Sequence, residues 1–81
     1  MGNGRVFWLS FVDPDRPKGE QFLGVAIVDG DDIVEAAKTA WELGCNPGGE
    51  VAGVPVPADR FVDYRNRLLS KEEASMIARI Q

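Results

Sequence analysis

The sequence predicts an α+β domain in which a small antiparallel sheet, with two main strands and a short edge strand, packs against two or three helices. Three observations support this class. Two segments near the start are rich in β-branched and aromatic residues and too short for helices. Later segments carry apolar residues at helical spacing. The 81 residues allow one domain, residues 1–81.

The first predicted strand runs from Val6 to Val12. Its alternation places Phe7, Leu9 and Phe11 on one face and Val6, Trp8, Ser10 and Val12 on the other. The second face is more apolar than a solvent-facing surface, so we expect another element to cover it.

The second predicted strand runs from Phe22 to Val28 and follows a hairpin loop with two prolines and a glycine. Its alternation groups Leu23 with Val25 and Ile27 on one face. Gly24 weakens a strand unless another group approaches it closely. We expect Trp8, a ligand or a second subunit to lie across it.

A helix is predicted over Asp32–Leu43. Asp32 serves as N-cap, and Glu35 three residues later completes an approximate capping box. Gly44 is suited to the left-handed position that ends the helix, and Cys45 to the hydrophobic contact of a Schellman motif. The apolar stripe consists of Ile33, Ala37, Ala40 and Trp41.

The second half begins with Glu50–Pro57, where prolines between apolar residues predict an edge strand or an extended segment. Ala58–Leu69 carries Phe61, Tyr64 and Leu68 at helical spacing, which predicts a second helix. Ser70-Lys71-Glu72-Glu73 forms a strict capping box and predicts a short third helix running to Ile80.

Composition limits the function. The chain has one cysteine and no histidine, which excludes an intrachain disulfide, the usual zinc sites and any imidazole base. We therefore expect no enzyme activity, metal or cofactor. A net charge of −4 opposes DNA binding. The absence of a signal-peptide pattern and of long apolar runs indicates a cytoplasmic protein that does not enter membranes. Self-association remains open as a source of stability.

The loop Asn46-Pro47-Gly48-Gly49-Glu50 is the first candidate site. It has two interpretations at even weight. It is either a tight turn after a helix, or a nest in which Gly48 and Gly49 present backbone N–H groups to phosphate or carboxylate oxygens.

Side chains supply the other candidates. Arg60, Arg65 and Arg67 lie on the predicted second helix, either as a solvated face or as phosphate contacts from one chain or two. Trp8 and Tyr64 are candidates to stack a base. Two further aromatic residues, Trp41 and Phe61, are expected in the core, and the carboxylates near Asp29 are expected to serve turns and caps.

Four stretches of the chain resemble a family of small bacteriophage and prophage proteins: Phe7–Asp13, Phe22–Val28, Ala40-Trp41 and Asn46–Val51. Small phage proteins of comparable size include anti-defence sponges, which bind the cyclic nucleotide signals of bacterial immunity without cleaving them. Together with the glycine loop and the arginines, the resemblance leads us to expect a cytoplasmic, homo-oligomeric binder of a small anionic nucleotide in the bacterial host cell. The alternative is a protein-interaction module that inhibits a host protein or acts as a structural accessory.

Overall fold

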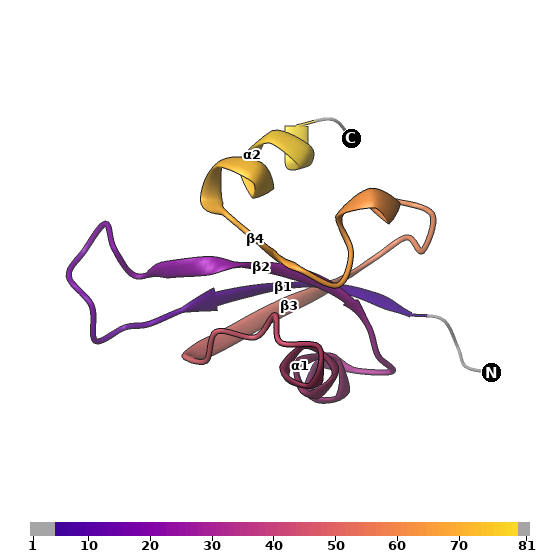
Figure 1. Ribbon diagram of the computed structural model, residues 1–81, viewed down its shortest axis with the longest axis horizontal. Helices are drawn as coiled ribbons and strands as arrows, with labels where there is room; N and C mark the ends of the chain where they lie inside the picture. Colours follow the sequence, from indigo (N-terminus) through magenta and orange to yellow (C-terminus); the bar gives the residue numbers. More distant parts are fainter. Residues whose placement is uncertain (1–4, 80–81) are drawn as a thin grey trace.

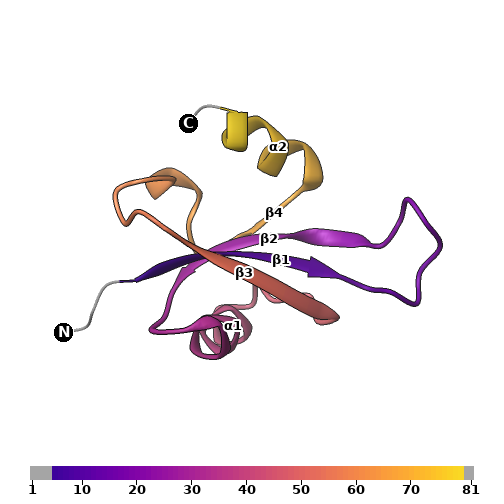
Figure 2. The same ribbon diagram turned by 180° about the vertical axis from the view of Figure 1, so that it is seen from behind.

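The computed structural model describes residues 5–79 and confirms the α+β class. The elements are β1 (Val6–Val12), β2 (Phe22–Asp29), α1 (Ile33–Glu42), β3 (Glu50–Val56), the 3-10 helix η1 (Val62–Tyr64), β4 (Leu68–Leu69) and α2 (Lys71–Arg79). Four antiparallel strands form one sheet in the order β3-β1-β2-β4. Helix α1 covers one face of the sheet, and α2 with η1 covers the other (Figures 1 and 2).

The β1–β2 hairpin forms as expected, and its loop closes with a hydrogen bond from the Asp13 N–H to the Gln21 carbonyl. An irregularity pairs Phe11 with Gly24 and Val12 with Phe22, which skips Leu23. A bulge of this kind turns the following side chains to the opposite face. Leu23 therefore packs with Ala26 on the α1 face, and the prediction that it shares a face with Val25 and Ile27 is wrong.

Two hydrophobic clusters lie on opposite faces of the sheet. The cluster under α1 contains Phe7, Leu9, Phe11, Ala26, Val28, Ala36, Ala40 and Cys45. The cluster under α2 contains Val6, Val25, Ile27, Leu69, Ala74 and Ile77, with Trp8, Phe22, Val56, Phe61 and Tyr64 packed against it. The expectation that the Trp8 face is covered is confirmed. A sheet buried on both faces explains why β1 and β2 are apolar on both sides.

Helix α1 begins and ends as predicted. Asp32 caps it by accepting a hydrogen bond from the Glu35 N–H at 2.8 Å. At the other end, the Cys45 N–H donates to the Ala40 carbonyl and the Gly44 N–H donates to the Trp41 carbonyl. With Gly44 at φ +81°, these two bonds form a Schellman motif.

Trp41 differs from its prediction, because 67% of it is exposed. The small side chains Ala36 and Ala40 bring the helix onto the sheet instead. Trp41 therefore lies on the flank of the helix.

The predicted helix over residues 58–69 is wrong. Phe61 and Asn66 adopt left-handed backbone angles, with φ of +57° and +65°, which interrupt any α-helix. The segment forms only the short η1, and Leu68–Leu69 pairs with β2 as the fourth strand. Arg60, Arg65 and Arg67 consequently do not share one helix.

The third predicted helix exists as α2. The Glu73 N–H donates to Ser70 Oγ at 3.1 Å, and the Ser70 N–H donates to Glu73 Oε1 at 3.4 Å, which is the reciprocal capping box. Its expected end at Ile80 lies outside the described residues. No helix in the described part of the chain is long and apolar enough to cross a membrane.

The prediction of an edge strand at Glu50–Pro57 is confirmed by β3, which lies beside β1 at the edge of the sheet formed by residues 5–79. Gly24 is approached closely by β4 rather than by Trp8, which pairs with Ile27. A Cβ on Gly24 would lie 2.7 Å from Leu68 Cδ1 and 2.8 Å from the Leu69 carbonyl oxygen. Glycine at this position lets β4 join the sheet.

Candidate functional site

The Asn46–Glu50 loop is a compact turn that joins α1 to β3. The Asn46 side chain fixes it by donating from Nδ2 to the Ala37 carbonyl at 3.1 Å and accepting the Gly48 N–H at Oδ1 at 2.8 Å. Gly48 and Gly49 both have positive φ, +89° and +76°, as the nest interpretation requires. The N–H of Gly48, however, already has an acceptor within the turn. The turn interpretation thus accounts for one of the two glycine donors.

Arg65 makes two side-chain contacts within the chain. Arg65 donates from Nη2 to the Ala58 carbonyl, and its Nη1 lies 3.5 Å from Asp29 Oδ1. These contacts hold the segment after β3 against the end of β2. Arg65 therefore has a structural role in this arrangement.

Arg67 pairs with α2. Its Nη1 lies 3.1 Å from Glu73 Oε2, and its guanidinium lies 5.8 Å from the centre of the Tyr64 ring. About half of the side chain is exposed, so the ion pair contributes little to stability.

Arg60 is exposed and lies in the turn where its N–H donates to the Pro57 carbonyl. This turn follows the end of β3, whereas the Gly48–Gly49 loop precedes its start. The seven residues of β3 separate them by about 23 Å at roughly 3.3 Å per residue. A single chain therefore does not bring Arg60 together with Gly48 and Gly49.

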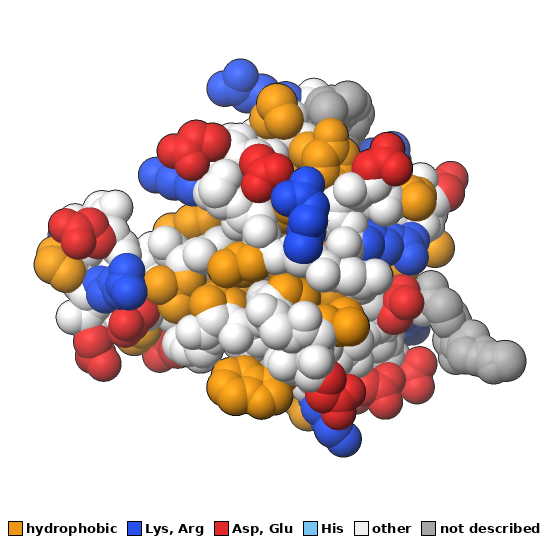
Figure 3. Space-filling model, viewed as in Figure 1, with side chains coloured by type: hydrophobic (Ala, Val, Ile, Leu, Met, Phe, Trp, Pro, Cys, Tyr) orange, Lys and Arg blue, Asp and Glu red, His pale blue; other side chains and the backbone are white. Residues whose placement is uncertain are grey.

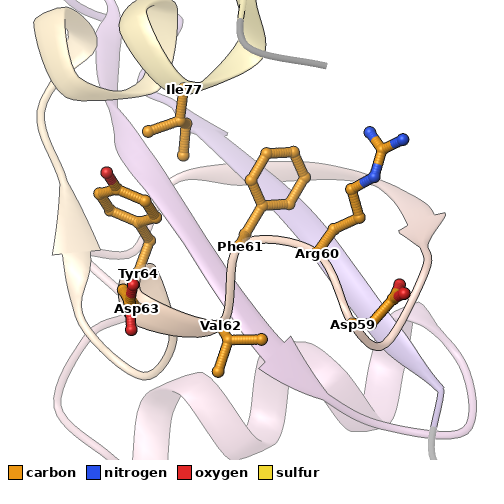
Figure 4. A pocket seen from close by; sticks show the side chains of 7 residues that line it. All are labelled: Asp59, Arg60, Phe61, Val62, Asp63, Tyr64 and Ile77. Atoms are coloured by element: carbon orange, nitrogen blue, oxygen red, sulfur yellow. The ribbon is translucent and has the colours of Figure 1, made fainter.

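A pocket of about 490 Å³ lies between the η1 segment and α2. It is lined by Asp59, Arg60, Phe61, Val62, Asp63, Tyr64 and Ile77. In Figure 4, the side chains of Phe61, Tyr64 and Ile77 surround a common space, whereas Val62 and Asp63 point away from it. Arg60 lies beyond the Phe61 ring, beside Asp59. The pocket thus joins two aromatic rings to one cation and two carboxylates.

Trp8 packs against the Phe61 wall of this pocket. Its ring meets that of Phe61 edge to face, with centroids 5.4 Å apart and an interplanar angle of 65°. Trp8 also lines a separate apolar depression beside α2, together with Phe22 and Val25. Of the predicted site residues, Arg60 and Tyr64 share a pocket, and Trp8 contacts its wall.

The sequence does not predict two of the lining residues, Phe61 and Ile77. Phe61 is expected in the core, and its left-handed backbone, which turns its ring toward Trp8 and the pocket, has no signal in the local sequence. Ile77 follows the apolar periodicity of α2, so it reads as an ordinary core residue. Only the pairing of β4 with β2 places α2 above the η1 segment.

Within residues 5–79, no three carboxylate or thiol side chains are grouped closely enough to hold a metal ion. Burial raises the pKa of the Cys45 thiol, which favours the unreactive protonated form.

Figure 3 shows acidic and basic side chains scattered around this face, with hydrophobic side chains exposed between them. No large area of one charge dominates this view.

Comparisons with known protein families, with curated proteins and with solved structures give no match.

Proposed function

We propose that the protein is a non-enzymatic binder of a small nucleotide, whose base occupies the pocket between Phe61 and Tyr64. The observation that carries the proposal is that these two rings and Ile77 surround one space, with Arg60 nearby. Aromatic faces stack any base, and ligand pockets typically combine apolar walls with a few polar groups.

The charges at the pocket limit how strongly a single chain binds a phosphate. Arg60 is the single cation of the lining, against the carboxylates of Asp59 and Asp63. Arg is shaped to bind phosphate oxygens with two hydrogen bonds. A phosphate at Arg60 still needs further donors to offset the neighbouring carboxylates.

The biological role that we propose is sequestration of a cyclic nucleotide immune signal by a phage protein. The resemblance to phage proteins and the absence of histidine motivate this role. A binder that holds a signal without cleaving it needs no general base.

Thermal unfolding with cyclic dinucleotides, cyclic trinucleotides and cyclic ADP-ribose isomers tests the proposal. A ligand at 100-fold excess over its Kd stabilises by about 2.7 kcal/mol. For a domain of this size, that raises Tm by roughly 10 °C or more. Constant Tm with every member of the panel contradicts the proposal.

Variants locate the binding. Arg60→Gln should weaken it at least tenfold. The matched control is Arg16→Gln, which removes the same charge from the hairpin loop, where Arg16 pairs with Asp13 at 3.6 Å. Equal loss in both variants would assign the effect to overall charge and contradict a site at Arg60.

A protein-interaction module is the second candidate function. The observation that favours it is a pair of exposed apolar side chains on one side of α1, Val34 and Trp41, which lie one helical heptad apart. Exposed apolar surface of this kind typically marks a contact with another protein. Recovery of one stoichiometric host protein from bacterial lysate, with no nucleotide in the denatured extract, would support this candidate over the first.

A further inference from the structure

We infer that two copies of the chain pair antiparallel along their β3 edges, and that this pairing places the Gly48–Gly49 loop of one copy beside Arg60 of the other. The sheet of four strands in each copy then continues across the interface as one sheet of eight. The inference rests on the proposed function only for the chemistry of the ligand. The pairing itself follows from β3 and α1.

The outer edge of β3 is able to pair. Successive residues of a strand direct their backbone groups to opposite sides, so one set faces β1 and the other faces outward. Pro55 has no N–H to give to β1 and fits the outward set. Val51 and Gly53 then also face outward, and their N–H groups are donors for a second strand.

One register pairs the whole length of two β3 strands. It places Gly53 opposite the partner's Gly53 and Val51 opposite the partner's Pro55. The N–H of Val51 then donates to the partner's Pro55 carbonyl, so Pro55 needs no donor of its own. Each copy uses both of its outward donors, which gives about four hydrogen bonds across the interface.

The same pairing covers the apolar flank of α1. A Cβ on Gly53 would lie 3.3 Å from Ile33 Cγ1, which identifies the Ile33 side of the helix as the side above β3. Ile33, Ala37 and Trp41 recur at four-residue spacing on that side, and Val34 lies one helical heptad before Trp41. Trp41 is 67% exposed and Val34 is 79% exposed.

The dimensions of the dimer suit these side chains. Three strand spacings separate the two copies of β1, which amounts to about 14 Å. Helices in direct contact lie about 8–10 Å apart. Trp41 and Val34 from both copies therefore fill a gap that smaller side chains would leave open.

The pairing sets a requirement for buried area. A stable interface needs about 800 Å² from each partner. This is about 15% of the 5211 Å² surface of the chain. We expect the outer edge of the seven-residue β3 and the Trp41 side of the ten-residue α1 to supply it.

Charge does not oppose the contact. Glu50 is the single charged residue of β3, and the register sets it opposite the partner's Val56. The two Glu50 carboxylates lie at opposite ends of the paired strands. Like charges therefore do not meet.

The pairing also joins the two parts of the candidate anion site. Beyond the strand ends, Gly49 comes opposite the partner's Pro57, and Gly48 opposite the partner's Ala58. The partner's Arg60 follows two residues later. The Gly49 N–H of one copy thus adds to the guanidinium of the other, because the Gly48 N–H is already held by Asn46 Oδ1.

Native mass spectrometry and sedimentation of the nucleotide-free protein test the pairing. We expect a dimer at tens of micromolar. Trp41→Arg should convert it to monomer, whereas Met76→Arg, which charges an apolar position on α2 that is also more than half exposed, should leave it dimeric. A monomeric wild-type protein at millimolar concentration would overturn the inference, as would equal loss of dimer in both variants.

Disulfide formation tests the register. Ala52→Cys and Val54→Cys are each combined with Cys45→Ala, and the two proteins are oxidised separately and as an equal mixture. The register pairs residue 52 of one copy with residue 54 of the other at about 4.5 Å between Cα atoms, which suits a disulfide. We expect cross-linking chiefly in the mixture. Cross-linking of either protein alone to the same extent would overturn this register.

Titration with inorganic pyrophosphate separates the inference from the proposed function. Pyrophosphate should bind the wild-type dimer and lose at least tenfold in affinity in both Trp41→Arg and Arg60→Gln. A dimer that binds neither pyrophosphate nor nucleotide contradicts the proposed function and the shared anion site, while its edge pairing is confirmed. A monomer that binds nucleotide contradicts the edge pairing alone.

Discussion

The backbone of Gly49 passes so close to Val12 that a Cβ on residue 49 would lie 2.3 Å from the Val12 carbonyl oxygen. A Cβ on the neighbouring Gly48 would have no atom within 4 Å apart from those of the adjacent residues. Both residues have positive φ. The two glycines of the loop are therefore required for different reasons.

This difference predicts unequal effects of alanine. Gly48→Ala should cost only the left-handed backbone penalty, about 1–2 kcal/mol. Gly49→Ala adds a clash with backbone that cannot move freely, and we expect about 3 kcal/mol or more. Urea unfolding of both variants measures the difference. Equal costs would show that the close contact with Val12 does not constrain the loop.

Asn46 gives a second prediction, because its two amide atoms make different contacts. Asn46→Asp keeps the acceptor for the Gly48 N–H but replaces the donor to the Ala37 carbonyl with a second oxygen. The new charge also lies near the carboxyl end of α1, where the helix dipole disfavours it. We expect a loss of about 2 kcal/mol in the free energy of unfolding. A variant as stable as wild type would show that the bond to Ala37 contributes nothing.

Cys45 should be protected from alkylation. It is 3% exposed, and burial raises its pKa, so the native thiol is both inaccessible and protonated. Iodoacetamide at pH 8 should modify it at least about 100-fold more slowly than in urea, since each 1.4 kcal/mol of opening lowers the rate about tenfold. Equal rates would contradict its burial.

The raised pKa of Cys45 also predicts a pH dependence. The unfolded thiol ionises near pH 8.5, before the folded one, so ionisation favours unfolding. The wild-type protein should therefore lose stability relative to Cys45→Ala as the pH rises above about 8.5 and through the folded pKa. Denaturant unfolding of both proteins between pH 7 and 10 measures this, and a constant difference would contradict it.

The capping box of α2 gives a further prediction. Ser70→Ala removes the hydroxyl that accepts the Glu73 N–H and should cost about 1 kcal/mol. Ser75→Ala changes an exposed residue inside the same helix and should be neutral or slightly stabilising, because alanine has the higher helix propensity. Because α2 contributes Ile77 to the pocket, Ser70→Ala should also weaken ligand binding. Chemical denaturation distinguishes the two variants, and similar stabilities would contradict the cap.

Elements whose signals are local can be predicted from the amino-acid sequence. Asp32 and Ser70 each accept a hydrogen bond from a backbone N–H three residues later, and Gly44 takes the left-handed angle that ends α1. Such contacts span only a few residues, so these residue types indicate helix boundaries directly. The apolar character of both faces of β1 indicated a covered sheet, and prolines in β3 indicated an edge strand. These features depend on neighbours along the chain.

The residues around the pocket come together through contacts that are distant in the sequence. Phe61 and Asn66 take left-handed angles because their segment must return to the sheet, where Leu69 is buried opposite Val25. That distant pairing outweighs a helical spacing of apolar residues, and it separates three arginines that the sequence grouped. It also sets Arg60 and the Gly48–Gly49 loop at opposite ends of β3. The physical reason is that burial of β4 against β2 depends on contacts about forty residues apart, which no local pattern encodes.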